Sequence, residues 1–446
     1  MRIILFLLLS INAFGQTCKC DITIPASAWY VDIDKAARAD AYVIAPKPGQ
    51  TVCFADGVRD VIEIHDIKGT AEAPITFASC SGTTIKGKAG QHVLQFYNSS
   101  FVRVSGQQGP IDITGGGHGL YFRDLSTDVE AHSISFHDLG YSGFEAKTDP
   151  TCDPKTWRGA FTLRNPRVIN CRFLNIASGE AIYIGESHYN TTVGVRCNGA
   201  AIQAQEHDVI GATVTGCTFE NIGRDAIQVG ASTAMVITNN KIKNFGTTKE
   251  YGQGSGITWN PGSTGEVAYN TIDTGSGFGI LAQGRGSGKI HHNIITNTGT
   301  PVDGGGIMVA AYAPVDASGY IVTDNTLVNI NRVGLEYYSP ISWGNNMLQV
   351  KSGTLKKQGG SAGKLTVSAK NVEVIGSSDL LKLDANFIPL EGSPAYVADG
   401  TADIGAFTAP RKPKTVTEPG TITVETIGTV TKIYVVTPSG KRIELQ

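Results

Sequence analysis

The amino-acid sequence predicts an all-β protein, a right-handed single-stranded parallel β-helix with a small C-terminal β appendage. Three observations predict this solenoid. A short strand headed by a small residue recurs along the chain, a polar turn residue recurs before a large apolar one, and 54 glycines are scattered among 446 residues without a collagen period. Strands this short cannot bury a face alone, so each must stack on its copy in the next coil. The glycines then fit the tight turns that such coils need.

The polar turn is the first part of the repeat, and it recurs from about residue 159 to 345. A short β-branched run leads to Asn or Cys, one variable residue and a large apolar residue: Cys171-Arg172-Phe173, Cys217-Thr218-Phe219, Asn240-Lys241-Ile242, Asn270-Thr271-Ile272, Asn293-Ile294-Ile295, Asn325-Thr326-Leu327 and Asn345-Asn346-Met347. Asn at a fixed turn position can stack along the axis, with each side-chain amide bonding the next. A second polar residue returns two positions after the apolar one, at Asn175, Asn221, Asn244, Thr274, Asn297 and Asn329. Asn also tolerates the left-handed backbone that sharp turns need.

The strand headed by a small residue is the second part of the repeat. Its apolar anchor recurs at positions 120, 161, 182, 227, 257, 280, 307 and 335. The shortest steps, from 161 to 182 and from 257 to 280, represent the bare coil, and longer steps carry inserted loops. A β-sandwich and βαβ units are the alternatives. No stretch of the repeat has an 11-residue helical period, which argues against βαβ units.

The segments outside the repeat predict the boundaries of the domain. Residues 1–16 combine a charged start, a short apolar run and small residues, as in a secretory signal peptide. The β-helix then spans 17–410, with 17–45 as an N-terminal cap and 350–410 as irregular last coils. Residues 411–446 are expected to form a linker and a small β tail.

The signal peptide predicts a secreted or periplasmic protein. Its apolar run is too short to cross a bilayer, and nothing later in the chain resembles a membrane helix. The formal net charge of −2 argues against nucleic acid as the main partner. We therefore expect a soluble monomer with no membrane span and no nucleic-acid partner.

Eight cysteines in an exported chain predict disulfides. Cys152 and Cys197 lie in two inserted loops and can tie them together. Cys171 and Cys217 hold equivalent turn positions in neighbouring coils, at a spacing compatible with either a bond or stacked thiols.

Several motifs resemble the pectate-lyase-like β-helix superfamily. The N-terminal ones are Pro48-Gly49-Gln50-Thr51-Val52, Ala55-Asp56-Gly57, Lys68-Gly69-Thr70-Ala71-Glu72-Ala73-Pro74-Ile75-Thr76-Phe77 and Ile85-Lys86-Gly87. They are similar to the first coils of chondroitinase B and alginate lyases. Gly392-Ser393-Pro394-Ala395 and Asp403-Ile404-Gly405-Ala406-Phe407 resemble the closing segment of the same group. The resemblance covers about residues 45–410 and implies the fold, but lyases, hydrolases, epimerases and binding proteins all share it.

By this resemblance, the strand after the polar turn faces a substrate cleft. The outward residues that follow the anchors are Tyr121, Thr162, Tyr183, Gln228, Thr258, Leu281, Met308 and Glu336. Two positions further come Arg123, Arg164, Gly185, Gly230, Asn260, Gln283, Ala310 and Tyr338. The first half carries rings, arginines and amides, and the second half is plainer. Aromatic rings stack on sugars and side chains with paired polar atoms hydrogen-bond them, and the guanidinium group of Arg pairs with the carboxylate of an acidic sugar. The alternative is a solvated polar face without a ligand.

Two insertions, roughly 141–158 and 187–208, are expected to wall this groove. Together they carry Glu145, Lys147, Arg158, Glu186, His188, Arg196, Glu206 and His207. We expect nine residues from strands and loops to bind substrate: Tyr121, Arg123, Lys147, Arg158, Tyr183, Glu186, His188, Gln228 and Asn260.

Glu180 and Asp225 are the candidate catalytic acids, because each stands two residues before an anchor in consecutive coils. In register they stack at roughly 5 Å, where two carboxylates can act as acid and nucleophile in glycoside hydrolysis. Carboxylates in this position can instead bond turn amides. A lyase needs a base and a cation that offsets a uronate carboxylate, and Arg164 is the candidate cation, beside Lys147 and Arg158.

Metal ions are expected to have at most a minor part. Glu180 and Asp225 could hold Ca²⁺ between them. Cys18-Lys-Cys20 could be half of a zinc site, but no second Cys or His pair at zinc spacing accompanies it. We therefore assign no metal ligand and leave Ca²⁺ as the one possible cofactor.

The expected function is binding and cleavage, by a lyase or a glycoside hydrolase, of an acidic, uronate-containing polysaccharide along one parallel sheet. The competing expectation is a non-catalytic surface or adhesive protein whose solenoid is only a scaffold. A flat face, with Glu180 and Asp225 bonded to the backbone, would favour that second function.

Overall fold

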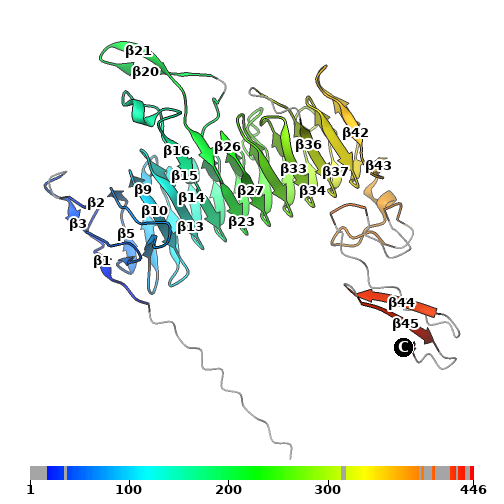
Figure 1. Ribbon diagram of the computed structural model, residues 1–446, viewed down its shortest axis with the longest axis horizontal. Coiled ribbons are helices and arrows are strands. Elements are labelled where there is room, and N and C mark those ends of the chain that lie inside the picture. Colours follow the sequence, from blue (N-terminus) through cyan, green and yellow to red (C-terminus); the bar gives the residue numbers. More distant parts are fainter. Residues whose placement is uncertain are drawn as a thin grey trace, which may run out of the picture.

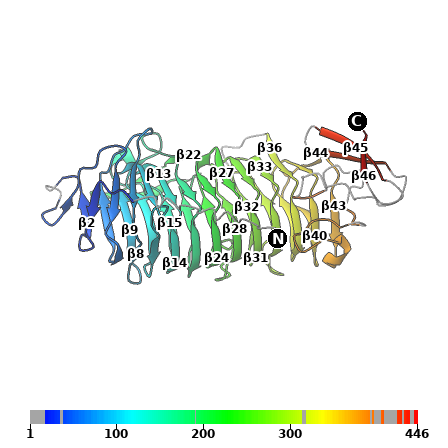
Figure 2. The ribbon, with the colours of Figure 1, turned by 90° about the horizontal axis from the view of Figure 1, so that it is seen from below.

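The structure is a computed structural model that describes residues 18–34, 38–189, 191–312, 318–390, 393–395 and 404–406, and the backbone of three strands between 422 and 445. The predicted signal peptide and the segment 407–421, with most of the predicted linker, lie outside the described residues. The chain winds into an elongated solenoid whose coils stack side by side in sequence order (Figures 1 and 2).

Three long parallel sheets, here called A, B and C, form the walls of the solenoid. From β4 to β41 each coil contributes one strand to each wall. Sheet A consists of β1 (Ile22–Ile24), β4 (Thr51–Phe54), β7 (Ile75–Ala78), β10 (Ser100–Ser105), β13 (Thr127–His132), β17 (Arg167–Ile169), β23 (Thr213–Thr215), β27 (Met235–Thr238), β30 (Gly265–Ala268), β33 (Ser287–His291), β36 (Gly319–Thr323), β39 (Ile341–Gly344) and β42 (Leu365–Val367).

Sheet B is the wall predicted to face substrate. It consists of β2 (Tyr30–Asp32), β3 (Tyr42–Val43), β6 (Ile62–His65), β9 (His92–Tyr97), β12 (His118–Arg123), β15 (Ser142–Ala146), β19 (Ile182–Ile184), β25 (Ile227–Val229), β29 (Ile257–Trp259), β32 (Phe278–Ala282), β35 (Gly305–Val309), β38 (Val333–Tyr337) and β41 (Thr354–Gln358).

Sheet C closes the coil between B and A. It consists of β5 (Gly57–Arg59), β8 (Thr83–Lys86), β11 (Ile111–Thr114), β14 (Ser135–Leu139), β18 (Arg172–Ile176), β24 (Thr218–Ile222), β28 (Lys241–Phe245), β31 (Thr271–Gly275), β34 (Ile294–Thr298), β37 (Thr326–Ile330), β40 (Met347–Val350) and β43 (Val372–Ile375).

Smaller elements decorate these walls. A three-stranded parallel sheet joins β16 (Thr162–Arg164), β22 (Asp208–Ile210) and β26 (Ser232–Thr233), and β20 (Val193–Cys197) pairs with β21 (Ala200–Ala204) as a hairpin. Two 3₁₀ turns, η2 (Pro154–Thr156) and η3 (Ser378–Leu381), lie outside the sheets. Three antiparallel strands, β44 (Ile422–Ile427), β45 (Val430–Val436) and β46 (Arg442–Leu445), form a separate sheet in the tail. Among the described residues no helix is long and apolar enough to cross a membrane.

The predicted column of anchors is confirmed for most of sheet B. The register places Ile182, Ile227, Ile257, Ile280, Ile307 and Leu335 on successive strands, with Leu120 and Phe144 before them. The prediction that Phe161 is an anchor is wrong. Phe161 adjoins β16, which pairs with β22 outside sheet B, and Phe144 fills the gap between 120 and 182. Gly143 is the small residue of that coil, and a Cβ there would lie 2.5 Å from the Phe173 ring.

The predicted asparagine ladder is confirmed in the second half of the solenoid. The Asn240 backbone N–H donates to Asn270 Oδ1 at 3.0 Å, and the same bond links Asn270 to Asn293 at 3.1 Å. The last step differs by one residue from the prediction, because Asn325 bonds Asn346 and not Asn345. Asn345 instead adopts the left-handed turn conformation, with φ 56°. The second polar column is left-handed as well, with φ between 55° and 59° at Asn175, Asn221, Asn244, Thr274, Asn297 and Asn329.

Disulfides tie the N-terminal cap to the coils. Cys18 bonds Cys80 and Cys20 bonds Cys53, so the Cys18-Lys-Cys20 motif belongs to disulfides. Cys171 and Cys217 are buried free thiols, and they extend the asparagine ladder: the Cys217 N–H donates to Asn240 Oδ1 at 2.9 Å.

Candidate functional site

The outward face of sheet B carries the residues that follow the anchors. The register places Tyr121, Glu145, Tyr183 and Gln228 on four consecutive strands, β12, β15, β19 and β25. Tyr121, Tyr183 and Gln228 therefore share the row that the sequence predicts. Glu145, expected in a loop, takes the place expected for Thr162, because β15 is the strand between β12 and β19.

A histidine–carboxylate cluster lies beside this row. The rings of His92 and His118 stack with their centroids 4.3 Å apart. His118 Nδ1 lies 2.5 Å from Glu145 Oε1 and 3.0 Å from Ser142 Oγ, whose hydroxyl also donates to Glu145. Burial disfavours the charged form of Glu145, but the hydrogen bonds from His118 and Ser142 outweigh burial and lower the pKa of its carboxyl. Glu145 is therefore held ionised.

Glu180, a predicted catalytic acid, has the opposite electrostatics. Burial raises the pKa of Glu180, and the nearby Glu145 charge adds to the rise against the attraction of Arg224. Its Oε1 lies 3.7 Å from Arg224 Nη1, whereas the buried Oε2 has no hydrogen-bond partner among the described residues. Arg224 also donates to the Tyr141 hydroxyl at 3.3 Å and to Glu250 at 2.8 Å. Glu180 is thus a carboxyl suited to hold a proton.

Asp225, the second predicted acid, lies in the coil after Glu180, as the pairing of Ile182 with Ile227 requires. Its side chain is covered, with the residue 1 % exposed, and its Oδ1 accepts the Ser255 backbone N–H at 2.6 Å. Burial raises the pKa of Asp225 to about 7. The expected alternative, a carboxylate bonded to a turn amide, is what the structure shows for Asp225.

Lys147 and Glu186 belong to a second buried cluster of charges. Lys147 Nζ donates to Asp149 at 2.8 Å and lies 5.4 Å from the centre of the Tyr183 ring. Burial opposes the charge of Lys147, but the nearby acidic groups, Glu186 foremost, outweigh it and raise its pKa. Burial raises the pKa of Glu186 well above its ordinary value, although Lys147 opposes the rise. Lys147 and Glu186 therefore form one charge cluster next to Tyr183.

Ser187 joins three of the predicted binding residues. Its hydroxyl lies 2.9 Å from the Tyr183 hydroxyl and accepts from Gln228 Nε2 at 2.8 Å and from Asn260 Nδ2 at 3.2 Å. These side chains come from β19, β25 and the turn after β29. The sequence gives no sign of this arrangement, because Ser187 differs from other loop serines only by its contacts.

The two insertions rise next to this face, with the hairpin β20–β21 standing clear of the solenoid (Figure 1). The predicted tie between them is confirmed by the disulfide between Cys152 and Cys197. At the base of the insertions His207 is fully buried, and its Nε2 accepts the Thr148 N–H at 3.0 Å. Burial lowers the pKa of His207 to about 4, so it is a neutral structural link.

Arg158 and His188 occupy the walls that these insertions form. The Arg158 guanidinium stacks 3.8 Å from the Tyr189 ring centre, and its Nε donates to the Glu206 carbonyl at 2.8 Å. His188 is largely exposed and places its Nδ1 3.2 Å from Glu206 Oε1. Arg158 is therefore engaged in holding the loop, and His188 faces solvent.

The two predicted strand arginines separate. Arg123 lies on sheet B, with its guanidinium 5.1 Å from the ring centres of both Tyr97 and Tyr121. Arg164 does not share that face, which corrects the predicted row: it is exposed on β16, which pairs with β22 in a sheet separate from sheet B. The inserted loop before residue 160 carries this strand out of the sheet B column.

Sequence reasoning placed Glu145 in a loop that walls the groove and not on a strand, and it assigned no part to His118. The step from 120 to 161 spans 41 residues, close to two bare coils, which is a signal that one copy lies between. Ser142-Gly143-Phe144-Glu145 is that copy. Its recognition would have placed Glu145 on the strand and His118 beside it.

Glu180 and Asp225 do not form a metal-binding group with a third acidic or histidine ligand among the described residues. The two groups of three or more potential ligands lie elsewhere: the four cysteines of the cap disulfides, and Asp32, His65 and Asp66. The fit for the expected Ca²⁺ at Glu180 and Asp225 is therefore poor, since Ca²⁺ takes six to eight oxygen ligands.

Comparisons with known proteins support the fold. Residues 164–349 match the family of right-handed β-helix regions. A lacto-N-biosidase of family GH136 from Eubacterium ramulus is similar in structure, with a TM-score of 0.50, 13 % identity, and coverage of 78 % of this chain and 68 % of that one. An alginate lyase from Paenibacillus sp. str. FPU-7 has a TM-score of 0.37 at 14 % identity, covering 80 % of this chain and 99 % of that one. A pectate lyase has a TM-score of 0.43 at 14 % identity, covering 87 % and 98 %. No curated protein sequence matches.

Proposed function

We propose that this chain, a right-handed parallel β-helix, binds and cleaves an acidic polysaccharide across the outward face of sheet B, as its resemblance to pectate-lyase-like proteins suggests. The proposed site extends from β12 to β29, where Glu145, Glu180 and Glu186 lie among aromatic rings and cations. Because this fold carries several chemistries, support must come from the residues of the site.

One observation carries the proposal: two neighbouring carboxyls have pKa values shifted in opposite directions. The pKa of Glu145 is lowered, despite burial, by His118 and Ser142, and the pKa of Glu180 is raised by burial. A glycoside hydrolase needs one carboxylic acid and one carboxylate at the scissile bond. Glu180 suits the acid, which gives its proton to the leaving oxygen as the glycosidic C–O bond breaks. Glu145 suits the base or nucleophile, and water supplies the new hydroxyl.

Cations around these carboxyls support an acidic sugar as substrate. Arg224 and Arg123 offer guanidinium groups on the face, and Lys147 adds an ammonium group. Guanidinium forks pair well with carboxylates, and the Tyr183 ring next to Lys147 suits the apolar face of a sugar.

Access to the site requires movement. Glu145, Glu180 and Glu186 are each less than 5 % exposed. We propose that the insertions carrying Cys152 and Cys197 shift when a polysaccharide enters.

The three disulfides fit a protein that works in an oxidising compartment, either secreted or periplasmic.

A lyase is the second candidate, and His92 favours it. Burial lowers the pKa of His92, so its imidazole is neutral near pH 7 and can take a proton next to a uronate carboxylate. Tyr141 is a poorer base, because burial raises its pKa. The products distinguish the two reactions, since elimination leaves an unsaturated sugar and hydrolysis does not.

The test is a screen of uronate-containing glycans that follows both new reducing ends and the absorbance of unsaturated products. We expect reducing ends without absorbance. Glu180→Gln and Glu145→Gln should each lower kcat by roughly 100-fold or more, the range of lost acid–base groups. Glu336→Gln is the matched control, because Glu336 is an equally buried carboxyl on the same face, in β38.

The competing function is a non-catalytic surface or adhesive protein. The bond from Ser255 to Asp225 and the low exposure of the three glutamates favour it. Absence of both products across the panel would support this alternative. Equal activity in Glu180→Gln and Glu336→Gln would show that cleavage takes place at another site.

A further inference from the structure

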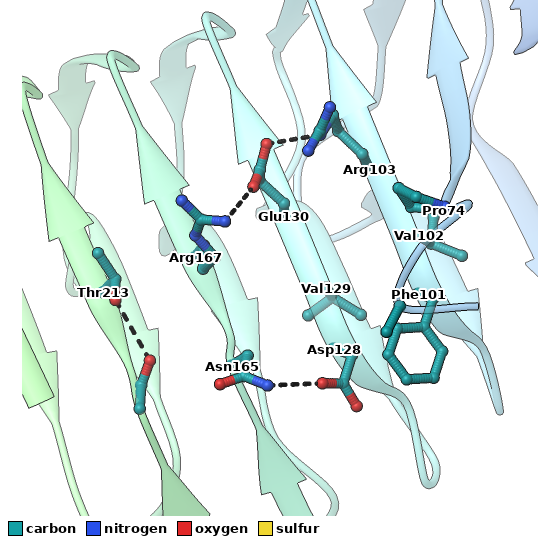
Figure 3. A pocket seen from close by; sticks show the side chains of 12 residues that line it. Pro74, Phe101, Val102, Arg103, Asp128, Val129, Glu130, Asn165, Arg167 and Thr213 are labelled. Carbon is teal, nitrogen blue, oxygen red and sulfur yellow. Dashed lines mark hydrogen bonds and ion pairs between the residues drawn. The ribbon is translucent and has the colours of Figure 1, made fainter. Parts of the chain in front are cut away.

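A hollow of about 410 Å³ lies on sheet A, on a different wall from the proposed site. It crosses β10, β13, β17 and β23, and the loop with Ala71 and Pro74 borders it (Figure 3). Four strands at about 4.8 Å spacing span roughly 14 Å. The volume lies within the range of small-molecule sites, about 300–1,000 Å³.

The upper part of the hollow is an arginine–glutamate–arginine group. Arg103 Nε lies 2.7 Å from Glu130 Oε1, and Arg167 Nη1 lies 3.2 Å from Oε2, so Glu130 stands between the two guanidinium groups (Figure 3). The three side chains carry a net charge of +1. Glu130 is nearly buried, whereas Arg103 and Arg167 are 38 % and 47 % exposed. Each guanidinium therefore keeps N–H groups that reach solvent.

An apolar border lies below these charges. Phe101 and Pro74 form it with partly exposed side chains, whereas the side chains of Val102 and Val129 point into the core and are 1 % exposed. Phe101 has a left-handed backbone, with φ 52°, and its ring lies beside Asp128 (Figure 3). The opposite rim is polar, since Asn165 Nδ2 donates to Asp128 Oδ1 at 2.7 Å.

The loop at the border is held in place. Its Gly69 N–H donates to the Ser100 carbonyl at 2.9 Å, and a Cβ at Gly69 would meet the Phe101 carbonyl at 2.5 Å. Thr70 and Ala73 exchange two backbone hydrogen bonds at 3.2 Å. These contacts fix the loop against β10, and a border that is already fixed lowers the entropic cost of binding.

We propose that this hollow is a non-catalytic binding site for one or two residues of a uronate-containing glycan. The Phe101 ring and Pro74 suit the C–H face of a sugar ring, the amide of Asn165 and the carboxylate of Asp128 suit hydroxyls, and the exposed N–H groups of Arg103 and Arg167 suit a carboxylate. Both oxygens of Glu130 are engaged, so the site binds without cleaving. The ligand class rests on the proposed function, whereas the location rests on the hollow alone.

The test is calorimetric titration of the full chain with trigalacturonate, triglucuronate and trimannuronate, and with maltotriose as the neutral probe. We expect at least one uronate trimer to bind, and Arg167→Ala to lose one binding site or weaken it roughly 10-fold, as loss of a charged hydrogen bond implies. Lys289→Ala is the matched control: Lys289 occupies the same outward column of sheet A, four strands beyond Arg167 and outside the hollow.

Three results would overturn the proposal: no binding of any uronate trimer, equal binding by Arg167→Ala and Lys289→Ala, or equal affinity for maltotriose. Catalysis is not part of this readout. An inactive chain that binds through Arg167 would refute the proposed function and keep this site. An active chain whose binding ignores Arg167 would do the reverse.

Discussion

The two halves of the sheet B outward face share a backbone and differ in chemistry. From β12 to β25 the row after the anchors is Tyr121, Glu145, Tyr183 and Gln228. From β32 to β35 the same row is Leu281 and Met308, which pack with Phe278 and Val333 into a small apolar cluster. The parallel register runs unbroken through both halves. The fold therefore supplies positions, and the side chains at these positions decide what the face can do.

The inserted loops follow the same division. The disulfide-linked insertions adjoin the charged half, whereas the step from Ile257 to Ile280 is a bare coil of 23 residues. Among the described residues of the bare coils no insertion covers the outward row of sheet B, and its apolar side chains pack against one another. The insertions bring Lys147 and Ser187 against the row of the charged half, and they bury its carboxyls.

We expect the largest effect from Asp225→Asn, and the quantity affected is the pH dependence of stability. The substitution replaces a titrating carboxyl with a neutral amide, and the coils of the apolar half also carry a neutral residue at this position. The pKa of Asp225 is about 7 in the folded chain and 3.8 when unfolded, because burial favours the protonated form. Between these values the unfolded chain has lost the proton and the folded chain keeps it, so wild-type stability falls as pH rises from about 4 to 7. The total contribution is on the order of 4 kcal/mol.

Urea unfolding of both proteins across this pH range measures the effect. The difference in unfolding free energy, wild type minus variant, should decrease steadily as pH rises. A difference that is constant with pH would mean that Asp225 is already ionised in the folded protein.

A pair of lysine variants tests the next largest effect. Lys147→Ala leaves Glu186 without its nearest cation, so we expect the pKa of Glu186 to rise further and kcat to fall roughly 100-fold, as for other lost electrostatic groups. Lys357→Ala, in the plainer half, should change kcat less than twofold, because Glu336 keeps its 3.0 Å contact with Arg332. Steady-state kinetics on the glycan found in the screen measures both. Equal losses of kcat in the two variants would show that the charged half and the plainer half contribute alike to activity.

Opening the disulfide should have a smaller effect. In Cys152→Ser with Cys197→Ser, the insertions lose their covalent tie and become easier to cleave, while the solenoid core is untouched. We expect faster proteolysis within 147–158 and 187–207, the inserted segments outside the coil strands, with the midpoint of unfolding nearly constant. Limited proteolysis with mass spectrometry locates the cuts. Cuts in the coils instead would show that the tie supports the whole solenoid.

Met308→Ala is expected to have the smallest effect. Met308 is only partly buried against Leu281 and Val333, so its truncation should cost about 1 kcal/mol, below the range of fully buried methionines. Activity should stay within twofold. A large loss of activity would mean that the apolar half takes part in substrate binding.

The sequence predicted the coil and its columns, because a solenoid repeats one local solution and the repeat is visible as a spacing. Ile182, Ile227 and Ile257 stack as expected, and the asparagines bond in the expected ladder. The exceptions are local. Phe161 has the sequence context of an anchor but adjoins a strand outside sheet B, because a pattern of small and apolar residues does not reveal which strand will pair. The ladder residue is Asn346, one position after the predicted Asn345.

The site was predicted less well than the fold. Tyr121, Tyr183 and Gln228 follow from the spacing alone, since alternation along a strand decides which side chains face outward. The pairing of Glu145 with His118, the burial of Asp225 and the hub at Ser187 do not. They depend on contacts between coils whose residues lie 27 to 73 positions apart, and on two loops whose path no repeat describes.

The sequence by itself therefore determined the solenoid, its columns and the wall on which polar residues gather. Only the tertiary structure decided which carboxyl pKa values rise and which fall, and where a hollow opens on sheet A. The physical reason is that stacking is periodic and local, whereas a pKa and a cavity depend on every neighbour that burial brings together.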